Sequence, residues 1–423
     1  MNRERTEPRE GAGGRARVAY LMSRFPKLTE TFILYEMLAV ERRGVTVEVY
    51  PLQRERTPTM HPEAAAFTAR AHFAPFLSLG ILRAQLRFLV GRPRAYLGAL
   101  FTWLGATLGS LRYFGGALVF FPKAVWFAER MQAQGITHVH AHFASHPAAA
   151  ALVIRRLTGI PYSFTAHGSD LHRDRRMLRE KVAEADFVAA ISDYNRRVIV
   201  AGCGERAAAK TIVLHCGVDT EVFRAGRRGI EGPAGRRFRI LCTGTLHEVK
   251  GQTHLVEACR ILSGRGVDFE CALVGDGPDR ERLGAQVARA GLADRVQFLG
   301  RRMRAEVVRL LGEADVLVAP SVPSRDGRRE GIPVAIMEGA ACGIPVVASD
   351  LSGIPELIED GKHGLLVPPG DAVALAGALE KLHADPSLRI ALGREGRAKV
   401  LSEFDLDTNA AALAQRFRSG DPR

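Results

Sequence analysis

The amino-acid sequence predicts an α/β protein with two doubly wound domains, and three observations support this fold class. The chain has 423 residues, which is too many for one ordinary hydrophobic core. Short apolar, β-branched runs alternate with stretches of helical pattern in both halves of the chain. The segment Arg224–Arg237, rich in arginine and glycine, separates the two series as an interdomain linker would.

The N-terminal series opens with a strand, a helix and a second strand. Arg17–Ser23 is an apolar strand, and Thr29–Arg43 has a helical pattern with Thr29 as the expected N-cap and Gly44 just past its end. Val45–Tyr50 is the second strand, so this opening indicates a parallel sheet. The further strands expected in this half are His138–Phe143, Tyr162–Ala166, Phe187–Ile191 and Thr211–His215.

A basic, apolar region, Ala64–Met131, interrupts this half. It is rich in leucine, phenylalanine and alanine, and Glu129 is its one acidic residue. Ala95–Leu111 carries no charge but is shorter than the ~20 apolar residues that span a bilayer. We therefore expect helices packed on the N-terminal domain. Their basic face is open to two interpretations, a solvated rim or a surface that rests on an anionic membrane.

The C-terminal series alternates strands and helices in the same way. Because ligands of doubly wound sheets bind at the carboxyl ends of the strands, functional motifs are expected just after each strand. The last part of the chain, Ala372–Phe417, has a helical pattern. The strands expected in this half are Arg239–Thr243, Phe269–Val274, Val296–Leu299, Val316–Ala319 and Pro345–Ala348.

Composition narrows the choice of partners and compartment. The formal net charge of +13 indicates an anionic partner, whether nucleic acid, an acidic membrane face or a phosphorylated ligand. The six cysteines form no C-x-x-C pair, which favours buried thiols in a reducing compartment. Met1–Arg17 lacks the apolar stretch of a secretory signal, so a cytoplasmic protein is expected.

The strongest functional pattern is the pair Glu330 and Glu338, two carboxylates separated by seven residues. Gly331 permits close approach of the backbone to a ligand, and Pro333 suits the first turn of a helix. The start of such a helix presents unpaired N–H groups and the positive end of its dipole, which together form an anion site. Carboxylates beside phosphate repel it, so both are expected to meet sugar and ribose hydroxyls instead.

This pattern resembles the E-x7-E motif of retaining glycosyltransferases of the GT-B fold, specifically glycosyltransferase family four. Other segments resemble that family in the same order, and their agreement carries the resemblance more than any single motif does. In the C-terminal half they are Gly244–Gly251, Val274–Pro278, Phe298–Gly300, Ala319–Ser321, Ser352–Glu356 and Gly364–Val367. In the N-terminal half they are His140–Phe143, Phe164–Asp170, His215–Asp219 and Arg24–Ile33, and the last resembles a subgroup that acts in exopolysaccharide and colanic-acid-type synthesis.

The resemblance implies a role for each matching residue. Lys250 would bind the diphosphate of the donor and stabilise charge on the leaving group. Glu330 would hold hydroxyls of the donor sugar, Glu338 would bind the nucleotide ribose, and His167 would reach the reacting sugar from the N-terminal domain. The other donor-binding residues implied are Gly244, Thr245, Gly275, Gly277, Leu299, Arg301, Gly331, Ile332 and Pro333.

One position departs from the family pattern. An arginine usually follows the glycine that begins the lysine-containing loop, whereas this chain has Thr245 there. The change removes a bidentate contact to phosphate. Either the diphosphate is held differently, with Arg301, Arg325, Arg328 and Arg329 as candidates, or the activity is lower.

No metal site is predicted. His138, His140 and His142 alternate along one strand, but this spacing alone is weak evidence for a metal, and we interpret them as a strand end that lines the cleft. Asp405–Asp407 matches the D-x-D pattern of another glycosyltransferase fold, but it lies far from the donor loops and is interpreted as a chance match. Leaving-group charge would then be stabilised by Lys250 and the helix terminus, so transfer is expected to need neither metal nor cofactor.

These patterns predict a GT-B protein, with two Rossmann-like domains facing across a cleft. Residues 1–225 would bind the acceptor, residues 226–400 the donor, and residues 401–423 would cross back to the first domain. The expected reaction is retaining transfer of a sugar from a nucleotide-diphosphate sugar to a polysaccharide or lipid-linked saccharide, at the inner face of the cytoplasmic membrane. The alternatives are a sugar-nucleotide epimerase of the same architecture and a basic nucleic-acid-binding protein, although no nucleic-acid module is recognisable.

Overall fold

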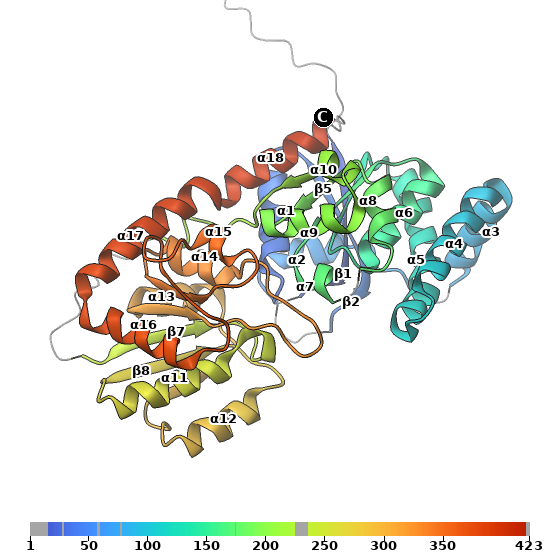
Figure 1. Cartoon of the computed structure of the whole chain (residues 1–423). Helices are drawn as coiled ribbons and strands as arrows, with labels where there is room; N and C mark the ends of the chain where they lie inside the picture. Colours follow the sequence, from blue (N-terminus) through green and yellow to red (C-terminus); the bar gives the residue numbers. More distant parts are fainter. Residues whose placement is uncertain are drawn as a thin grey trace, which may run out of the picture.

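The computed structural model describes residues 16–27, 29–56, 60–76, 78–173, 175–224 and 236–419. The chain forms two lobes, and each contains one parallel six-stranded sheet with helices packed around it (Figure 1). The two doubly wound domains predicted from the sequence are therefore confirmed. The predicted linker, Arg224–Arg237, lies almost wholly outside the described residues.

The N-terminal sheet has the strand order β2–β1–β3–β4–β5–β6. Because the order reverses between β1 and β3, the carboxyl ends of these two strands flank a crevice. The strands are β1 Arg17–Phe25, β2 Thr46–Arg54, β3 His138–His142, β4 Tyr162–Ala166, β5 Phe187–Ala190 and β6 Thr211–Val213. The helices are α1 Thr31–Arg42, α2 Ala64–Arg70, α3 Leu79–Gly91, α4 Pro93–Thr107, α5 Leu111–Ala133, α6 His146–Thr158, α7 Ser169–His172, α8 Leu178–Glu184, α9 Asp193–Cys203 and α10 Arg206–Lys210.

The C-terminal sheet has the strand order β12–β11–β10–β7–β8–β9, which reverses between β7 and β10. The loops after β7 and β10 therefore face each other at the switch point, where ligands of this fold class bind. The strands are β7 Phe238–Thr243, β8 Phe269–Val274, β9 Val296–Gly300, β10 Val316–Ala319, β11 Val346–Ser349 and β12 Leu365–Val367. The helices are η1 Glu248–Lys250 (a 3₁₀ turn), α11 Gln252–Gly264, α12 Arg280–Arg289, α13 Arg304–Glu313, α14 Val334–Ala341, α15 Ile354–Leu357, α16 Ala372–Ala384, α17 Pro386–Glu403 and α18 Leu406–Ser419.

Three local predictions differ from the structure. The N-cap of α1 is Glu30 rather than Thr29, because a turn closed by the Glu30 amide and the Lys27 carbonyl delays the start of the helix. Pro333 is the N-cap of α14, in an extended conformation, rather than its first helical residue. The three-residue strand β12 was not predicted, since so short a run shows no clear periodicity.

The last helix returns to the N-terminal lobe. In Figure 1, α18 continues from the end of α17 and lies over the N-terminal sheet, where Phe417 packs in one apolar cluster with Met37 and Val40 of α1. Asp405 caps α18 by accepting from the backbone N–H of Thr408, and Asp407 pairs with an arginine of α1. The two aspartates thus hold a helix in place, while Leu406 between them lines the pocket that also contains Glu338.

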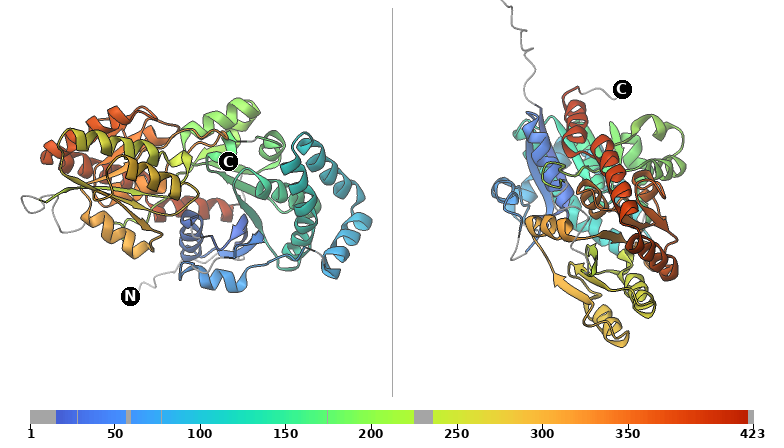
Figure 2. Two further views of the ribbon diagram at one scale, coloured as in Figure 1. Left: turned by 90° about the horizontal axis from the view of Figure 1, so that it is seen from below. Right: turned by 90° about the vertical axis from the view of Figure 1, so that its left-hand side faces the viewer.

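The basic, apolar region forms α2, which packs against β2, and the helices α3, α4 and α5, which lie at the end of the N-terminal lobe remote from the C-terminal lobe (Figures 1 and 2). They are anchored by fully buried side chains such as Trp103 and Phe121, which join the core beneath α6. The expected packing of helices on the N-terminal domain is therefore found. None of the helices in the described part of the chain has the length and apolarity needed to cross a bilayer.

Candidate active site

The centre of the site is an ion pair between two loops of the C-terminal sheet. Lys250 ends the 3₁₀ turn that follows β7, and Glu330 lies in the loop that follows β10. The Lys250 Nζ atom is 2.6 Å from Glu330 Oε2, and both side chains remain partly exposed. Because β7 and β10 are the two strands at the reversal of order, the fold itself brings these loops together.

Close backbone contacts shape this site. Gly275, just after β8, has a positive φ of 136°, and a Cβ atom there would lie 1.9 Å from the carbonyl oxygen of Gly244. A Cβ atom at Gly331 would lie 2.4 Å from the carbonyl oxygen of His167 in the other lobe. Side chains at these positions would push the loops or the lobes apart, so glycine is required by packing.

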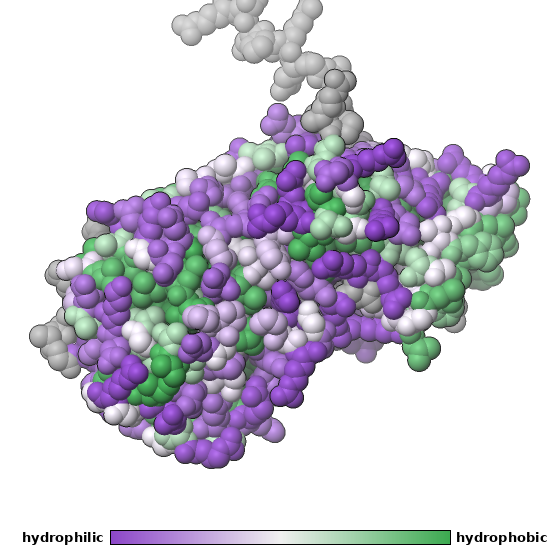
Figure 3. All heavy atoms as spheres, viewed as in Figure 1, coloured by the Kyte–Doolittle hydropathy of each residue, from purple (hydrophilic) through white to green (hydrophobic). Residues whose placement is uncertain are grey.

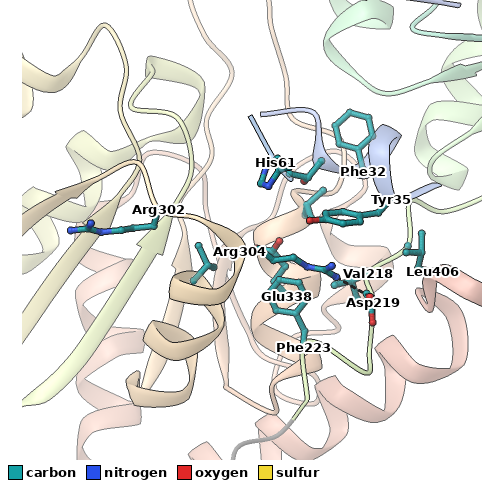
Figure 4. Close-up of a pocket in the computed structure, with 14 residues that line it drawn as sticks. Phe32, Tyr35, His61, Val218, Asp219, Phe223, Arg302, Arg304, Glu338 and Leu406 are labelled. Atoms are coloured by element: carbon teal, nitrogen blue, oxygen red, sulfur yellow. Dashed lines mark ion pairs between the residues drawn. The ribbon is translucent and has the colours of Figure 1, made fainter. Parts of the chain in front are cut away.

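Glu338 lies one turn inside α14 and lines a pocket between the lobes, shown in Figure 4. The guanidinium of Arg304, at the start of α13, pairs with Asp219 at 3.0 Å and lies 4.0 Å from the centre of the Tyr35 ring. Burial raises the pKa of Glu338 to about 7, although the positive charges of Arg304 and Lys250 act to lower it. This carboxyl group therefore ionises near neutral pH. It is close enough to Lys250 for the two charges to interact.

His167 follows β4 and lies at the contact between the lobes. Its side chain is buried, with Nε2 3.0 Å from His142 Nδ1 and Nδ1 3.8 Å from Cys216 Sγ, and it packs against Phe32. Burial lowers its pKa to about 3, so the imidazole is neutral at neutral pH. In this conformation both ring nitrogens face protein groups, and the contribution of His167 to sugar transfer stays a prediction.

The three alternating histidines of β3 do not line the cleft, so that interpretation was wrong. Residues of α18 cover this face of the sheet, with the ring centre of Phe417 5.3 Å from those of both His138 and His140. The Nε2 atom of His142 lies 3.2 Å from a carboxylate oxygen of Glu36, on α1. Among the described residues, one group of histidine, cysteine or acidic side chains is close enough together to hold a metal ion, and it consists of Glu36, His140 and His142. The ring nitrogens of His140 are already within hydrogen-bond distance of the hydroxyls of Ser163 and Thr165.

Comparison with known proteins agrees with this geometry. Residues 29–222 match the family model Glycosyltransferase Family 4, and residues 237–385 match the model Glycosyl transferases group 1. The colanic acid biosynthesis glycosyltransferase WcaL of Escherichia coli K12 is 32% identical over 418 residues, which cover 94% of this chain and 99% of that protein. The chain belongs to glycosyltransferase family four. The family resemblance inferred from the motifs is thereby confirmed.

Further relatives and solved structures resemble this glycosyltransferase in sequence or in fold. The amylovoran biosynthesis glycosyltransferase AmsK of Erwinia amylovora is 38% identical over 258 residues, or 59% of this chain and 61% of AmsK. The structure of Anabaena HepE in complex with UDP superposes with a TM-score of 0.71 at 19% identity, covering 95% of this chain and 100% of HepE. Sucrose-phosphate synthase from Thermosynechococcus elongatus gives a TM-score of 0.70 at 21% identity, with 96% and 99% covered. The fold is thus GT-B, as predicted, and the epimerase alternative is not favoured.

Several residues predicted to bind the donor are not gathered around the Lys250–Glu330 pair of the glycosyltransferase. Ile332 is buried in the apolar core, so only its backbone could meet a ligand. Arg301 points to Asp276, at 3.8 Å, and Leu299 lines a separate groove beside α13. Thr245 does lie in the lysine loop, where its carbonyl accepts from the side chain of Gln252.

The pocket around Glu338 contains residues that the sequence patterns did not mark as donor-binding, above all Arg304 and Tyr35. They come from opposite lobes, at the start of α13 and in the middle of α1. Two segments that resemble the family, Arg24–Ile33 and His215–Asp219, do contribute to this pocket, through Phe32 and Asp219 among others. Arg304 and Tyr35 come into contact only because the two lobes pack together, and no local sequence motif predicts how the lobes pack.

Proposed function

We propose that this glycosyltransferase transfers a sugar from a nucleotide-diphosphate sugar to a saccharide acceptor, with retention of configuration and without a metal ion. The observation that carries the proposal is the meeting of Lys250 and Glu330 at the switch point of the C-terminal sheet, with Glu338 close by. One cation and two carboxylates at the start of a helix suit a ligand that combines a diphosphate with several hydroxyls.

In the proposed complex each of the three side chains meets a different part of the donor. Glu338 accepts hydrogen bonds from the ribose, Glu330 accepts from hydroxyls of the sugar, and Lys250 contacts the diphosphate. The bond between the anomeric carbon and the leaving phosphate oxygen breaks, and the acceptor oxygen bonds to that carbon from the same face. The acceptor proton passes to an oxygen of the departing nucleoside diphosphate, whose growing charge Lys250 stabilises.

Relatives and structural neighbours support the proposed substrate classes. WcaL and AmsK are named for colanic acid and amylovoran biosynthesis, and HepE was solved with UDP and with UDP-glucose. We infer that the donor here is a nucleotide-diphosphate sugar and that the acceptor is a growing polysaccharide or a lipid-linked saccharide. A panel of UDP- and GDP-sugars, each tested for raising the melting temperature, would identify the donor. NMR of the product would give its anomeric configuration, and inversion would contradict the proposal.

An exposed apolar surface at the end of the N-terminal lobe supports a membrane location. Figure 3 shows hydrophobic residues gathered there, over the helices α3, α4 and α5. Leu79 and Leu111 are 85% and 93% exposed, and exposed leucines recur every three or four residues along α3, so they share one face. The exposed apolar residues are Leu79, Leu82, Leu86, Leu89 and Val90 on α3, Leu97 and Phe101 on α4, and Leu111, Leu118 and Val119 on α5.

The charges beside this surface favour an anionic membrane as its partner. Arg94 and Arg112 are exposed near the helix ends, whereas Glu129, the one acid of the region, is paired with Arg83 and Arg87. An apolar face with a basic border binds the interface of anionic bilayers. We therefore propose that α3–α5 rest on the inner face of the cytoplasmic membrane, close to a lipid-linked acceptor.

Vesicle flotation tests this membrane contact. The protein should float with vesicles that contain phosphatidylglycerol at low salt, and much less with vesicles of phosphatidylcholine alone. Leu86→Glu should abolish flotation, whereas Val373→Glu, at an exposed valine of the C-terminal lobe, should leave it unchanged. If Leu86→Glu floats as the wild type does, or if it only converts a dimer to a monomer, the membrane proposal is wrong.

A further inference from the structure

A second group of hydrogen-bond donors lies beside Lys250. His247 precedes the 3₁₀ turn, with its Nδ1 atom 3.2 Å from the backbone nitrogen of Val249 and its Nε2 atom 3.2 Å from Arg328 Nη1. Both neighbours are N–H donors, and a neutral imidazole offers a lone pair on only one nitrogen. Whichever tautomer His247 adopts, one N–H of the ring faces another N–H. This cluster is short of one acceptor.

The loop after β10 turns Arg328 toward that cluster. Arg328 and Glu330 both contact the lysine loop, whereas Arg329 between them lies 3.5 Å from the hydroxyl of Tyr194 in the other lobe. The Arg328 side chain is 35% exposed, so a ligand can reach it.

One acidic residue also contacts this arginine. Asp326 Oδ2 lies 2.9 Å from Arg328 Nε and 3.4 Å from Arg173 Nη2, so its charge is shared between two guanidinium groups. The contact fixes the Nε edge of the Arg328 guanidinium and leaves Nη1 directed at His247. Asp326 therefore orients the arginine without supplying the missing acceptor between Nη1 and the imidazole.

The charge balance of the site requires a further cation beside Lys250 to bind a diphosphate. Lys250 is already matched by Glu330, so that pair alone offers little net charge to a diphosphate, and Thr245 supplies no cation. The other arginines considered from the sequence are placed elsewhere. Arg301 faces an aspartate outside the lysine loop, and Arg325 lies 3.5 Å from the carboxylate of Glu248 with a side chain that is 95% exposed.

We propose that His247 and Arg328 together bind one phosphate oxygen of the donor and take over the contact that an arginine at position 245 would make. The proposal rests on the proposed function, since it requires a diphosphate at Lys250. An oxygen between the two groups accepts from Arg328 Nη1 and from the Nε2–H of His247. The Nδ1 atom of His247 then accepts from the Val249 amide, and every donor in the cluster has a partner.

Calorimetric titration of the full-length protein with UDP and GDP, and with uridine and guanosine, tests this assignment. Loss of a charge-assisted hydrogen bond should weaken binding of the nucleoside diphosphate by about tenfold or more in Arg328→Ala and His247→Ala. Binding of the nucleoside, which has no phosphate, should not change. Arg325→Ala, in the same loop, is the matched control and should bind as the wild type does. Thr245→Arg should restore affinity to Arg328→Ala.

The Lys250→Ala variant distinguishes failure of this inference from failure of the proposed function. If Lys250→Ala loses affinity for the nucleoside diphosphate while Arg328→Ala and His247→Ala keep it, the assignment of these two residues is wrong. If none of the three variants loses affinity, the diphosphate does not bind at Lys250, and the proposed function fails together with this inference.

Discussion

The Lys250 ammonium and the Glu330 carboxylate form an ion pair with 2.6 Å between Nζ and Oε2, across a sequence separation of 80 residues. The pair keeps each group in place while the donor is absent. In the proposed donor complex, a diphosphate at Lys250 would replace the carboxylate as its partner, and Glu330 would then be released to accept hydrogen bonds from sugar hydroxyls. The same two residues would thus stabilise the site without a donor, and each would bind a different part of the donor when it is present.

Replacing Lys250 by alanine should lower kcat by about 10²- to 10³-fold, because removal of one fixed group that stabilises leaving-group charge has that order of effect. Affinity for the nucleoside diphosphate should fall as well. Steady-state kinetics with the identified donor would measure both. Lys381→Ala, at an exposed lysine on α16, is the control and should be fully active. A Lys250→Ala enzyme with normal kcat would contradict the assigned role.

Glu330→Gln should separate recognition of the sugar from recognition of the nucleotide. The neutral amide no longer pairs with Lys250, so affinity for the nucleoside diphosphate alone should stay the same or rise. Affinity for the complete nucleotide sugar should fall, because strong acceptors for the sugar hydroxyls are lost. Titration with both ligands would measure the difference. An equal loss for the two ligands would show that Glu330 does not contact the sugar.

The sequence patterns located the loops of this site better than they located the side chains that complete it. Lys250 and Glu330 each follow a strand of a doubly wound sheet, and ligand-binding loops of such sheets gather at the carboxyl ends of the strands, so their meeting could be expected from the motifs and the fold class. The contact between Arg304 and Tyr35 could not be expected, because it joins two domains and no local sequence pattern specifies how those domains are placed relative to each other. The histidines of β3 were misplaced because alternation along a strand selects a face without revealing that α18 covers it.

Glu338 should make stability depend on pH. Burial raises its pKa to about 7 in the folded chain, against an ordinary value of 4.5, so the folded state holds the proton more tightly than the unfolded state. The contribution of Glu338 to the free energy of unfolding is therefore largest below pH 4.5 and is lost as pH rises through 7. Denaturant unfolding at pH 5 and pH 8 would compare the wild type with Glu338→Gln. The wild type should lose up to a few kcal/mol more than the variant between these pH values. An identical pH dependence in both proteins would contradict the raised pKa.

Glu356 should hold the two lobes together. From α15 in the C-terminal lobe, its carboxylate accepts from the backbone N–H groups of Asp193 and Tyr194, both at 2.7 Å, at the start of α9 in the N-terminal lobe. A carboxylate at a helix N-terminus stabilises such a contact by about 0.3–1 kcal/mol, and by up to ~2 kcal/mol when partly buried. Removal of the charge in Glu356→Gln should therefore favour opening of the cleft.

Opening admits water, so the predicted consequence is a larger share of donor hydrolysis relative to sugar transfer, with a larger radius of gyration in solution scattering. Glu359→Gln is the matched control, since Glu359 lies on the same lobe and pairs with Lys362, only three residues away. Glu356 acts through lobe contact in this argument, so binding of the nucleotide to the C-terminal lobe alone should change little. If Glu356→Gln weakened nucleotide binding strongly and left the ratio of hydrolysis to transfer unchanged, the residue would belong to the donor site and not to closure.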